Sequence, residues 1–429
     1  MIHHECFWTA TMPAPGSYSE NPLPGKTDVV VVGGGYTGVS AALTLAKGGA
    51  RVTLLEAQSI GWGASARNGG QALSCLHDPL THLVEKYGRE RAREMFFAAV
   101  RAAGAVERVI KDEAIECDYW RCGSIEAASR PAHYENFKRE QSTLYDVAGY
   151  KVQVLSKSEV ESELGTQAYH GLMINSRGGS VQPAKFVLGL ASAAERAGAE
   201  IHEATPVLAI ERLGNAPAQD GSRFSVRTDR GDVHAKDVVL AANAWVGTFI
   251  PEFRGRVFPV ESFILATEPL PAELAARLIP NNRVVYDTRR VLAYYRLSPD
   301  NRMVWGGEVT FSDVRPETNI RALRRGMLRV FPELAEFKIE YYWGGTLGLT
   351  FAESVHAGMI DGMWYSMCYV GHGVTLAVYL GGQVANGILG RPVDNPFADL
   401  PIPRIPFLRD RAWYANAVKA RYGLLDSIA

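Results

Sequence analysis

The chain has 429 residues, which is too long for one compact hydrophobic core and favours two closely packed domains. Hydrophobic residues make up 47% and charged residues 21%, a composition typical of a soluble globular protein. The 45 basic and 46 acidic residues nearly cancel, so we expect no strong electrostatic field for nucleic acid or an anionic membrane.

The sequence contains no clear membrane span, secretory signal or metal-binding motif. No apolar run approaches the roughly 20 residues that a membrane span needs. Residues 1–26 lack a basic start followed by an apolar stretch, so we interpret them as a surface extension and not as a secretory signal. The five cysteines are scattered and odd in number, which favours a reduced, cytoplasmic setting. Cys117 and Cys122 could be metal ligands, but no second Cys or His pair lies at ligand spacing, so we expect no metal site.

A βαβ unit follows residue 26. The β-branched run at 28–32 predicts a strand buried on both faces, residues 36–48 have helical spacing, and residues 51–55 predict a second buried strand. Because parallel strands need a crossover between them, the helix fits this connection.

The rest of the chain alternates between helical and strand patterns. We expect helices at 80–115, 183–198, 317–331 and 371–389, an extended stretch at 392–409, and strands at 200–205, 224–228, 238–241, 257–268, 292–297 and 303–305. No repeat, low-complexity tract or long linker separates these elements, so we expect interleaved and not consecutive domains.

The βα turn carries the first chemical signal. Gly33, Gly35 and Gly38 fit the pattern G-x-G-x-x-G, which allows a tight turn, a close approach of pyrophosphate and close packing of helix on strand. The helix that starts at Tyr36 and Thr37 would offer free N–H groups to the phosphates. Glu56 ends the second strand, where a carboxylate can accept hydrogen bonds from ribose hydroxyls. Together these features predict a dinucleotide site.

Two further segments favour FAD over NAD. The loop at 61–71 is rich in glycine and small polar residues, so it can lie along an extended cofactor and offer Ser65 and Asn68 as hydrogen-bonding groups. Residues 371–375 begin a helix whose dipole could face the pyrimidine edge of a flavin and stabilise the charge of the reduced ring. The predicted cofactor-binding residues are Gly33, Gly35, Tyr36, Thr37, Gly38, Glu56, Ser65, Arg67, Asn68, Gly69, Gly70, Val207, Ala242, Gly371, Gly373, Val374 and Thr375.

These segments, with the strand end at 240–245, resemble the D-amino acid oxidase (DAO) superfamily of flavoproteins. Stretches at 60–71, 117–119, 292–302 and 342–345 are most similar to its gamma-glutamylputrescine oxidase group. The resemblance implies an α/β fold in which a Rossmann-type FAD domain is interleaved with an α+β substrate domain built on a large antiparallel sheet. It also implies a substrate pocket at the domain junction and contact of Val207 with the adenine.

We divide the chain accordingly. Residues 1–26 form an N-terminal extension; 27–90, 150–250 and 341–429 form the FAD domain; 91–149 and 251–340 form the substrate domain.

Departures from relatives narrow the expected substrate. Leu347 stands where D-amino acid and glycine oxidases have a carboxylate-binding arginine, and Thr375 where sarcosine oxidases have a lysine. A carboxylate beside the reacting carbon would be held poorly. Residues 342–351 contain no cysteine, which predicts noncovalent FAD. Val304 replaces the lysine that promotes oxygen reduction in sarcosine oxidases, so O2 or another acceptor remains open.

The predicted activity is oxidation of a C–N bond in a small, gamma-glutamylputrescine-like amine, giving an imine and then an aldehyde and ammonia. Candidate pocket residues are Tyr294, Tyr295, Arg296, Trp343 and His372. Aromatic residues in strands are more often core, Arg296 could anchor a remote carboxylate or pair within the protein, and His372 fits the cofactor environment better than a base. Alternatives are a secondary amine or N-methyl amino acid dehydrogenase or oxidase, and a flavoprotein with a structural or assembly role. No signal indicates an oligomeric state.

Overall fold

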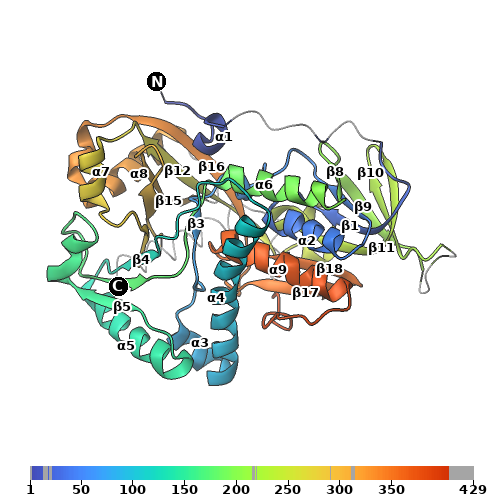
Figure 1. Ribbon diagram of the computed structural model, residues 1–429, viewed down its shortest axis with the longest axis horizontal. Helices are drawn as coiled ribbons and strands as arrows, with labels where there is room; N and C mark the ends of the chain where they lie inside the picture. The colour runs from blue at the N-terminus through green and yellow to red at the C-terminus, as the bar shows by residue number, and fades with distance from the viewer. Residues whose placement is uncertain are drawn as a thin grey trace.

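The computed structural model describes residues 2–12, 18, 22–214, 218, 220–289, 291–310 and 315–404, with only the backbone given for 308–310. Figure 1 shows a wide molecule with one sheet toward each end and helices between and around them. The extended stretch is described as far as residue 404; its remainder, and the rest of the tail to 429, lie outside the described residues.

The first sheet contains the predicted βαβ unit. Strand β1 (Lys26–Val32) runs parallel to β2 (Val52–Leu55) on one side and to β11 (Gly231–Leu240) on the other. The order is β17-β18-β11-β1-β2-β8, and β10 and β9 extend from β11 as an antiparallel flap. The remaining bounds are β8 (Glu200–His202), β9 (Val207–Arg212), β10 (Phe224–Thr228), β17 (His356–Ile360) and β18 (Met363–Met367).

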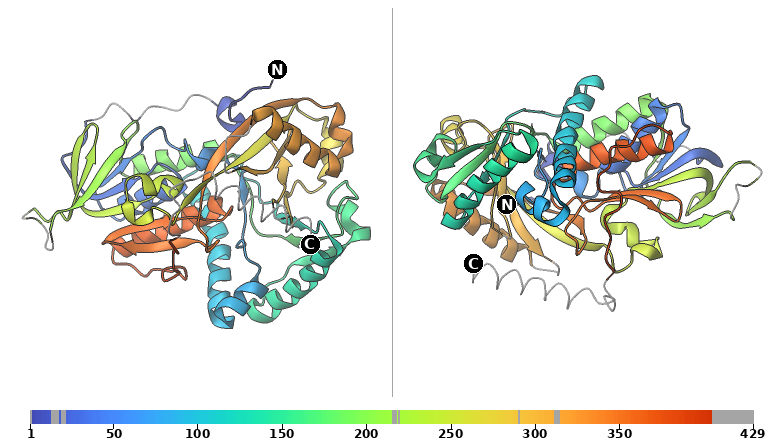
Figure 2. Two further views of the ribbon diagram at one scale, coloured as in Figure 1. Left: turned by 180° about the vertical axis from the view of Figure 1, so that it is seen from behind. Right: turned by 90° about the horizontal axis from the view of Figure 1, so that it is seen from below.

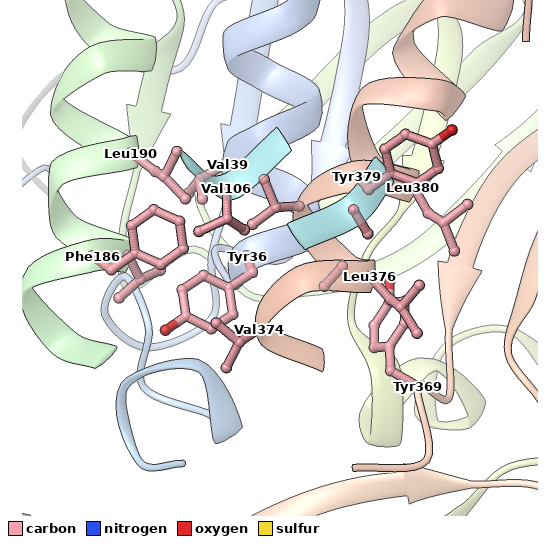
Figure 3. Close-up of a cluster of buried hydrophobic side chains, with 14 of the residues drawn as sticks. Tyr36, Val39, Val106, Phe186, Leu190, Tyr369, Val374, Leu376, Tyr379 and Leu380 are labelled. Carbon is pink, nitrogen blue, oxygen red and sulfur yellow. The ribbon is translucent and has the colours of Figure 1, made fainter. Parts of the chain in front are cut away.

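Three helices cover this sheet on one side. Helix α2 (Tyr36–Lys47) packs against α6 (Pro183–Arg196) and α9 (Gly373–Ile388), and α9 packs in turn against the long helix α4 (Arg89–Asp112). Their buried side chains form one cluster, in which Tyr36 and Phe186 face each other at a ring distance of 5.3 Å (Figure 3). A helix with apolar residues on several sides has to be buried in this way.

The second sheet has the order β16-β12-β15-β14-β13-β4-β6-β5. All its pairs are antiparallel except β13 with β4, so the predicted large antiparallel sheet is confirmed. The bounds are β4 (Ser124–Ala127), β5 (Gln153–Ser156), β6 (Gly171–Asn175), β12 (Phe258–Thr267), β13 (Val284–Asp287), β14 (Tyr294–Leu297), β15 (Met303–Thr310) and β16 (Ile339–Leu349).

Helices cover the outer face of the second sheet, as expected. Helix α8 (Pro316–Val330) packs on β12 and β15, and α7 (Ala272–Leu278) contributes to the same buried cluster. Helices α3 (Leu80–Tyr87) and α5 (Pro131–Ala148) lie beside α4 at the lower side of Figure 1, and Figure 2 shows the same arrangement from behind and below. A short pair, β3 (Gln71–Ala72) with β7 (Gly179–Ser180), lies apart from both sheets.

Several predicted boundaries are wrong. The helix expected at 80–115 is divided at Gly88, whose φ of 80° interrupts helical geometry. Strands β5, β6 and β16 belong to the second sheet, although the predicted boundaries at 150 and 341 assigned them to the FAD domain. The buried face of α4 joins the core of the first sheet, not of the second. Which strands pair depends on long-range contacts that periodicity does not report.

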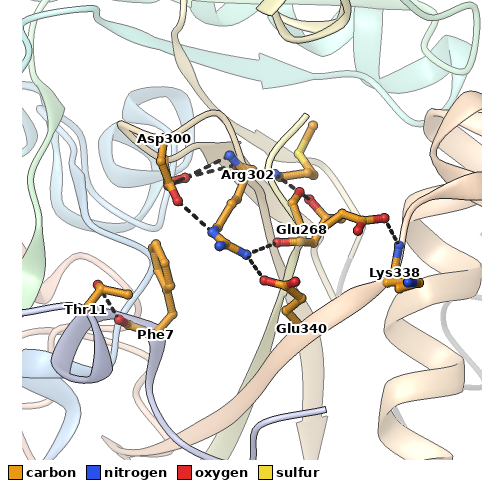
Figure 4. A network of polar contacts seen from close by, with 10 residues as sticks. Phe7, Thr11, Glu268, Asp300, Arg302, Lys338 and Glu340 are labelled. Atoms are coloured by element: carbon orange, nitrogen blue, oxygen red, sulfur yellow. Dashed lines mark hydrogen bonds and ion pairs between the residues drawn. The ribbon is translucent and has the colours of Figure 1, made fainter. Parts of the chain in front are cut away.

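The N-terminal segment is also not a surface extension over its described part. Helix α1 (Phe7–Ala10) places Phe7 and Trp8 in the core, where Trp8 is fully buried. His3 extends the edge of β16 through backbone hydrogen bonds with Glu340 and Tyr342. The guanidinium of Arg302 lies 5.4 Å from the Phe7 ring and also pairs with Asp300 and Glu340 (Figure 4).

Candidate active site

The glycine-rich turn between β1 and α2 has the geometry that a pyrophosphate needs. Gly33 has φ +113°, and a Cβ there would lie 2.7 Å from the Ala241 carbonyl oxygen. A Cβ on Gly38 would lie 1.8 Å from the carbonyl oxygen of Gly33. No acidic residue stands in the first turn of α2, so its N-terminus keeps its partial positive charge for an anion.

Glu56 lies beside this turn, as predicted. Its carboxylate accepts hydrogen bonds from the backbone N–H groups of Gly34 at 2.6 Å and Gln58 at 2.9 Å. Burial raises the pKa of Glu56, and the bond from Gly34 opposes that rise. The carboxylate is thus fixed at the end of β2, where ribose hydroxyls of a dinucleotide would approach.

Two predicted cofactor residues on α2 use their side chains in packing. The Tyr36 hydroxyl donates to the Pro183 carbonyl oxygen at 3.1 Å, and the Thr37 hydroxyl lies 2.6 Å from the hydroxyl of Tyr369. The backbone N–H of Tyr36 donates to the Ser65 side-chain oxygen at 3.0 Å. Ser65 therefore ties the following loop to the turn. Because the side chains of Tyr36 and Thr37 bond within the protein, these two residues would contact a cofactor through their backbone groups.

The loop after β2 is held firmly by the rest of the protein. The Asn68 side chain bonds within the loop, donating to the carbonyl oxygens of Ala64 and Ser65 and accepting from the Gly70 N–H. Two indoles hold it from outside: Trp8 donates to the Asn68 carbonyl oxygen at 2.9 Å, and Trp343 to the Arg67 carbonyl oxygen at 2.8 Å. The amide of Asn68, predicted to face the cofactor, thus shapes the loop.

Helix α9 begins at the junction between the sheets. Gly371 has φ +85°, His372 caps the helix, and no acidic residue stands in its first turn. The Thr375 hydroxyl donates to the Leu73 carbonyl oxygen at 2.9 Å, which ties the helix to the chain after the loop. Gly373 and Val374 follow the cap, and Val374 is buried.

His372 is a neutral imidazole. Burial lowers its pKa to about 4. Its Nδ1 lies 3.0 Å from the Val370 carbonyl oxygen, which can only accept, so Nδ1 carries the proton. Nε2 is then an acceptor and lies 3.6 Å from the Cys75 sulfur. A neutral His372 would bring no positive charge to the surroundings of a bound cofactor.

A cavity of about 990 Å³ lies between the loop, the start of α9 and one face of the second sheet. Arg67, Asn68 and Gly69 line it from the loop, and Gly371, His372 and Val374 from the helix. A Cβ on Gly69 would lie 3.0 Å from the Tyr294 ring, so the loop is in close contact with the sheet there. The pocket predicted at the junction of the two folding units is present in this structure.

The predicted pocket residues divide into two groups. Tyr294 and His372 line the cavity. Tyr295 does not, because consecutive strand residues face opposite sides of a sheet. Its ring stacks on Trp305 at 4.5 Å in the outer core, and its hydroxyl donates to that of Tyr169.

Arg296 and Trp343 lie behind the loop, so their prediction as pocket residues is wrong. Arg296 is buried, donates to the Gly70 carbonyl oxygen at 3.1 Å and lies 5.0 Å from the Trp8 ring. Burial lowers its pKa to about 10. The Trp343 ring meets Trp8 edge-on at 6.3 Å. Both support the loop from its rear.

Val207 and Ala242 lie at the rim of the first sheet. Val207 begins β9, two residues after Thr205, whose N–H donates to the Glu56 carbonyl oxygen at 2.8 Å. Ala242 follows β11, and its nitrogen would lie 3.1 Å from a Cβ on Gly33. Both lie near the predicted nucleotide site, and their contact with a nucleotide stays a prediction.

Sequence reasoning missed many polar residues of the cavity wall, among them Cys75, Glu126 and Tyr286. The Cys75 sulfur lies 3.5 Å from the Tyr286 hydroxyl and so connects it with His372. Glu126 lies on the four-residue strand β4, which carries no motif. No signal in the sequence indicates that these side chains meet.

Within the described part of the chain, no group of three or more His, Cys, Asp or Glu side chains is arranged to hold a metal ion. Over the same residues, none of the helices is long and apolar enough to cross a membrane.

Comparisons with known proteins agree with the geometry. The family model described as FAD dependent oxidoreductase (DAO) matches residues 28–386. The chain is 34% identical to a probable oxidoreductase OrdL of Haemophilus influenzae, over 85% of this chain and 83% of that protein. It is 33% identical to gamma-glutamylputrescine oxidoreductase of Escherichia coli, over 89% and 87% of the two chains.

Solved structures share the fold. The crystal structure of glycine oxidase from Geobacillus kaustophilus superimposes with a TM-score of 0.73 at 21% identity, covering 90% of this chain and all of that one. Both the glycine-rich turn and the fixed Glu56 fit the dinucleotide part of FAD. The chain belongs to the DAO family of FAD-dependent oxidoreductases.

Proposed function

We propose that this family member oxidises the primary amine of a gamma-glutamylputrescine-like substrate. Removal of two electrons and two protons from R–CH2–NH2 gives the imine R–CH=NH, and water then converts it to R–CHO and NH3. The bound flavin supplies the two-electron acceptor, and O2 as final acceptor would leave as H2O2. The similarity to the Escherichia coli gamma-glutamylputrescine oxidoreductase supports this choice of substrate.

One observation carries the proposal: the side chains that β12 and β16 turn to the cavity are mostly apolar, and the one hydroxyl among them, on Ser262, lies 3.1 Å from the Tyr294 hydroxyl. Leu347, at the position where an arginine would hold an α-carboxylate, lines the cavity together with Ile264 and Leu349. A carboxylate next to the reacting carbon would lose water there, and these two strands offer it no cationic side chain within the lining. An alkyl amine whose carboxylate lies at a distance fits this wall.

In this reaction the side chains of the cavity would bind and orient the substrate and exclude water. The apolar wall excludes water and positions the alkyl chain, which lowers the entropic cost of reaction. His372 is neutral and accepts at Nε2, so it does not repel a cationic amine during binding. Arg67 also lines the cavity, and its Nε donates to the Trp62 carbonyl oxygen at 2.9 Å.

The test is anaerobic reduction of the purified holoenzyme by a panel of amines. We expect gamma-glutamylputrescine to bleach the flavin absorbance at much lower concentration than glycine, sarcosine or short monoamines. Bleaching by N-methyl amino acids, but not by gamma-glutamylputrescine, would assign the chain to secondary amine oxidation instead. Rapid reoxidation of the reduced enzyme in air would support O2 as acceptor, and very slow reoxidation would indicate a dehydrogenase.

A further inference from the structure

One wall of the cavity is a transverse row of side chains on the second sheet. In register across neighbouring strands, Met173 on β6 pairs with Glu126 on β4, Glu126 with Tyr286 on β13, and Tyr286 with Tyr294 on β14. All four line the cavity. The row therefore leads from the loop after β2, which contacts Tyr294 through Gly69, toward the carboxyl group of Glu126.

The carboxyl group of Glu126 is remote from the loop. It lies two strands away from Tyr294, and neighbouring strands are about 4.8 Å apart, so the two positions are separated by about 10 Å. A ligand that places its reacting amine near the loop can reach Glu126 only with a group further along its chain.

Two other acidic residues of the wall are satisfied within the protein. The Glu140 carboxylate accepts from the N–H groups of Leu80 at 2.6 Å and Thr81 at 2.9 Å, and from the Thr81 hydroxyl. Asp287 accepts from the backbone N–H groups of Arg289 and Ala293 and forms an ion pair with the Arg289 side chain at 3.4 Å.

Glu126 differs from them. Its carboxyl group accepts a hydrogen bond from the Tyr286 side chain, but no ion pair of the described residues includes it, although it lines the cavity together with Glu140 and Asp287. Burial, followed by the negative charges of Glu140 and Asp287, raises its pKa to about 7, and the hydrogen bond from Tyr286 only partly opposes that rise. A carboxylate in such surroundings gains most from a cation that the ligand brings with it.

We propose that Glu126 binds the non-reacting ammonium group of the substrate and thereby determines specificity. The inference rests on the proposed function, under which this group is the α-ammonium of the gamma-glutamyl end. Glu126 acts as a specificity residue and takes no part in the oxidation of the distant C–N bond.

Two unreactive ligands separate this role from catalysis. Gamma-glutamylbutylamide keeps the α-ammonium and α-carboxylate but lacks the terminal amine that the proposed reaction oxidises, and glutaric acid monobutylamide lacks both the terminal amine and the α-ammonium. Each is titrated into the holoenzyme while the perturbation of the flavin spectrum is recorded. We expect the wild type to bind the first about tenfold more tightly, the size of a hydrogen bond to a charged group.

The variant Glu126→Gln keeps the shape of the side chain and removes its charge. We expect it to bind both ligands equally, whereas Glu126→Asp keeps part of the preference. Glu211→Gln is the matched control, because it removes an exposed carboxylate on β9 that does not line the cavity, and it should keep the wild-type preference.

The outcomes are separable. A wild type without a preference for the ammonium ligand, or a Glu126→Gln variant that keeps it, would overturn the role of Glu126. Equal weakening of both ligands in Glu126→Gln would do the same. Failure of gamma-glutamylputrescine to reduce the wild-type flavin, with the preference intact, would overturn the proposed reaction and leave the ammonium site standing.

Discussion

At the scale of single residues, the glycine-rich turn depends on the absence of side chains at defined points. A Cβ on Gly38 would lie 1.8 Å from the Gly33 carbonyl oxygen, which is backbone and cannot move aside as a side chain can. Gly38 also packs α2 closely against β1, so the effect of a substitution extends to the start of the helix.

We therefore expect Gly38→Ala to lose FAD and to melt at a lower temperature, because the turn must open to admit the methyl group. The measurement is bound FAD per chain together with thermal unfolding. Gly25→Ala is the control, since a Cβ there meets nothing within 4 Å. Full FAD content in Gly38→Ala would contradict the placement of the pyrophosphate at this turn.

At the scale of elements, the N-terminal segment behaves as part of the site's support. Trp8 is fully buried, its indole N–H donates to the Asn68 carbonyl oxygen, and its own carbonyl oxygen accepts from the Gln182 side chain at 2.7 Å. The segment thus connects α6 with the loop after β2. The sequence of this segment is short and has no helical periodicity, so it does not indicate that the segment supports the loop.

Trp8→Ala should destabilise the protein by about 3–5 kcal/mol through the cavity that it leaves. It should also weaken FAD binding, because the loop loses one of its two indole donors. Thermal unfolding and FAD titration of the apoprotein measure the two effects. Trp120→Ala, which truncates an indole that is 59% exposed, should change neither by much. Unchanged FAD affinity in Trp8→Ala would show that the loop holds its shape without the segment.

At the scale of the whole molecule, two buried histidines make stability depend on pH. Burial lowers the pKa of His356 and of His372 to about 4 in the folded protein. In the unfolded chain the value is about 6.5, so the unfolded state binds more protons in between. Stability is therefore full above about pH 6.5 and is lost as the pH falls toward 4.

We expect the melting temperature of the holoenzyme to fall over this range, with His356 alone accounting for about 3 kcal/mol. His356 is fully buried, and its Nε2 lies 3.0 Å from the Thr350 hydroxyl. His356→Gln should show a shallower decrease than the wild type when both are measured from pH 7.5 to 4.5. An identical slope in the two proteins would exclude His356 as a source of the acid sensitivity.

Local patterns were sufficient for the nucleotide half of the molecule. The β-branched run of β1, the three glycines, the start of α2 and Glu56 lie within one continuous stretch, and each has a conformational requirement that few other residues meet. For the same reason Gly371 and His372 at the start of α9 were predicted where they are found.

The wall of the cavity could not be derived in this way. Glu126, Tyr286 and Tyr294 come from strands up to 170 residues apart in the numbering, and only the register of the second sheet places them in one row. Because side chains alternate along a strand, Tyr294 faces the cavity and Tyr295 does not. Arg296 and Trp343 lie behind the loop, where they contact its backbone and do not line the cavity.

The sequence by itself thus determined the glycine-rich turn and the position of Glu56 beside it, because backbone geometry at a turn depends on neighbouring residues. Only the tertiary structure decided which side chains line the cavity and that Trp8 supports the loop. Those arrangements depend on pairing between distant strands and on which face of each strand is covered, and neither leaves a periodic trace in the chain.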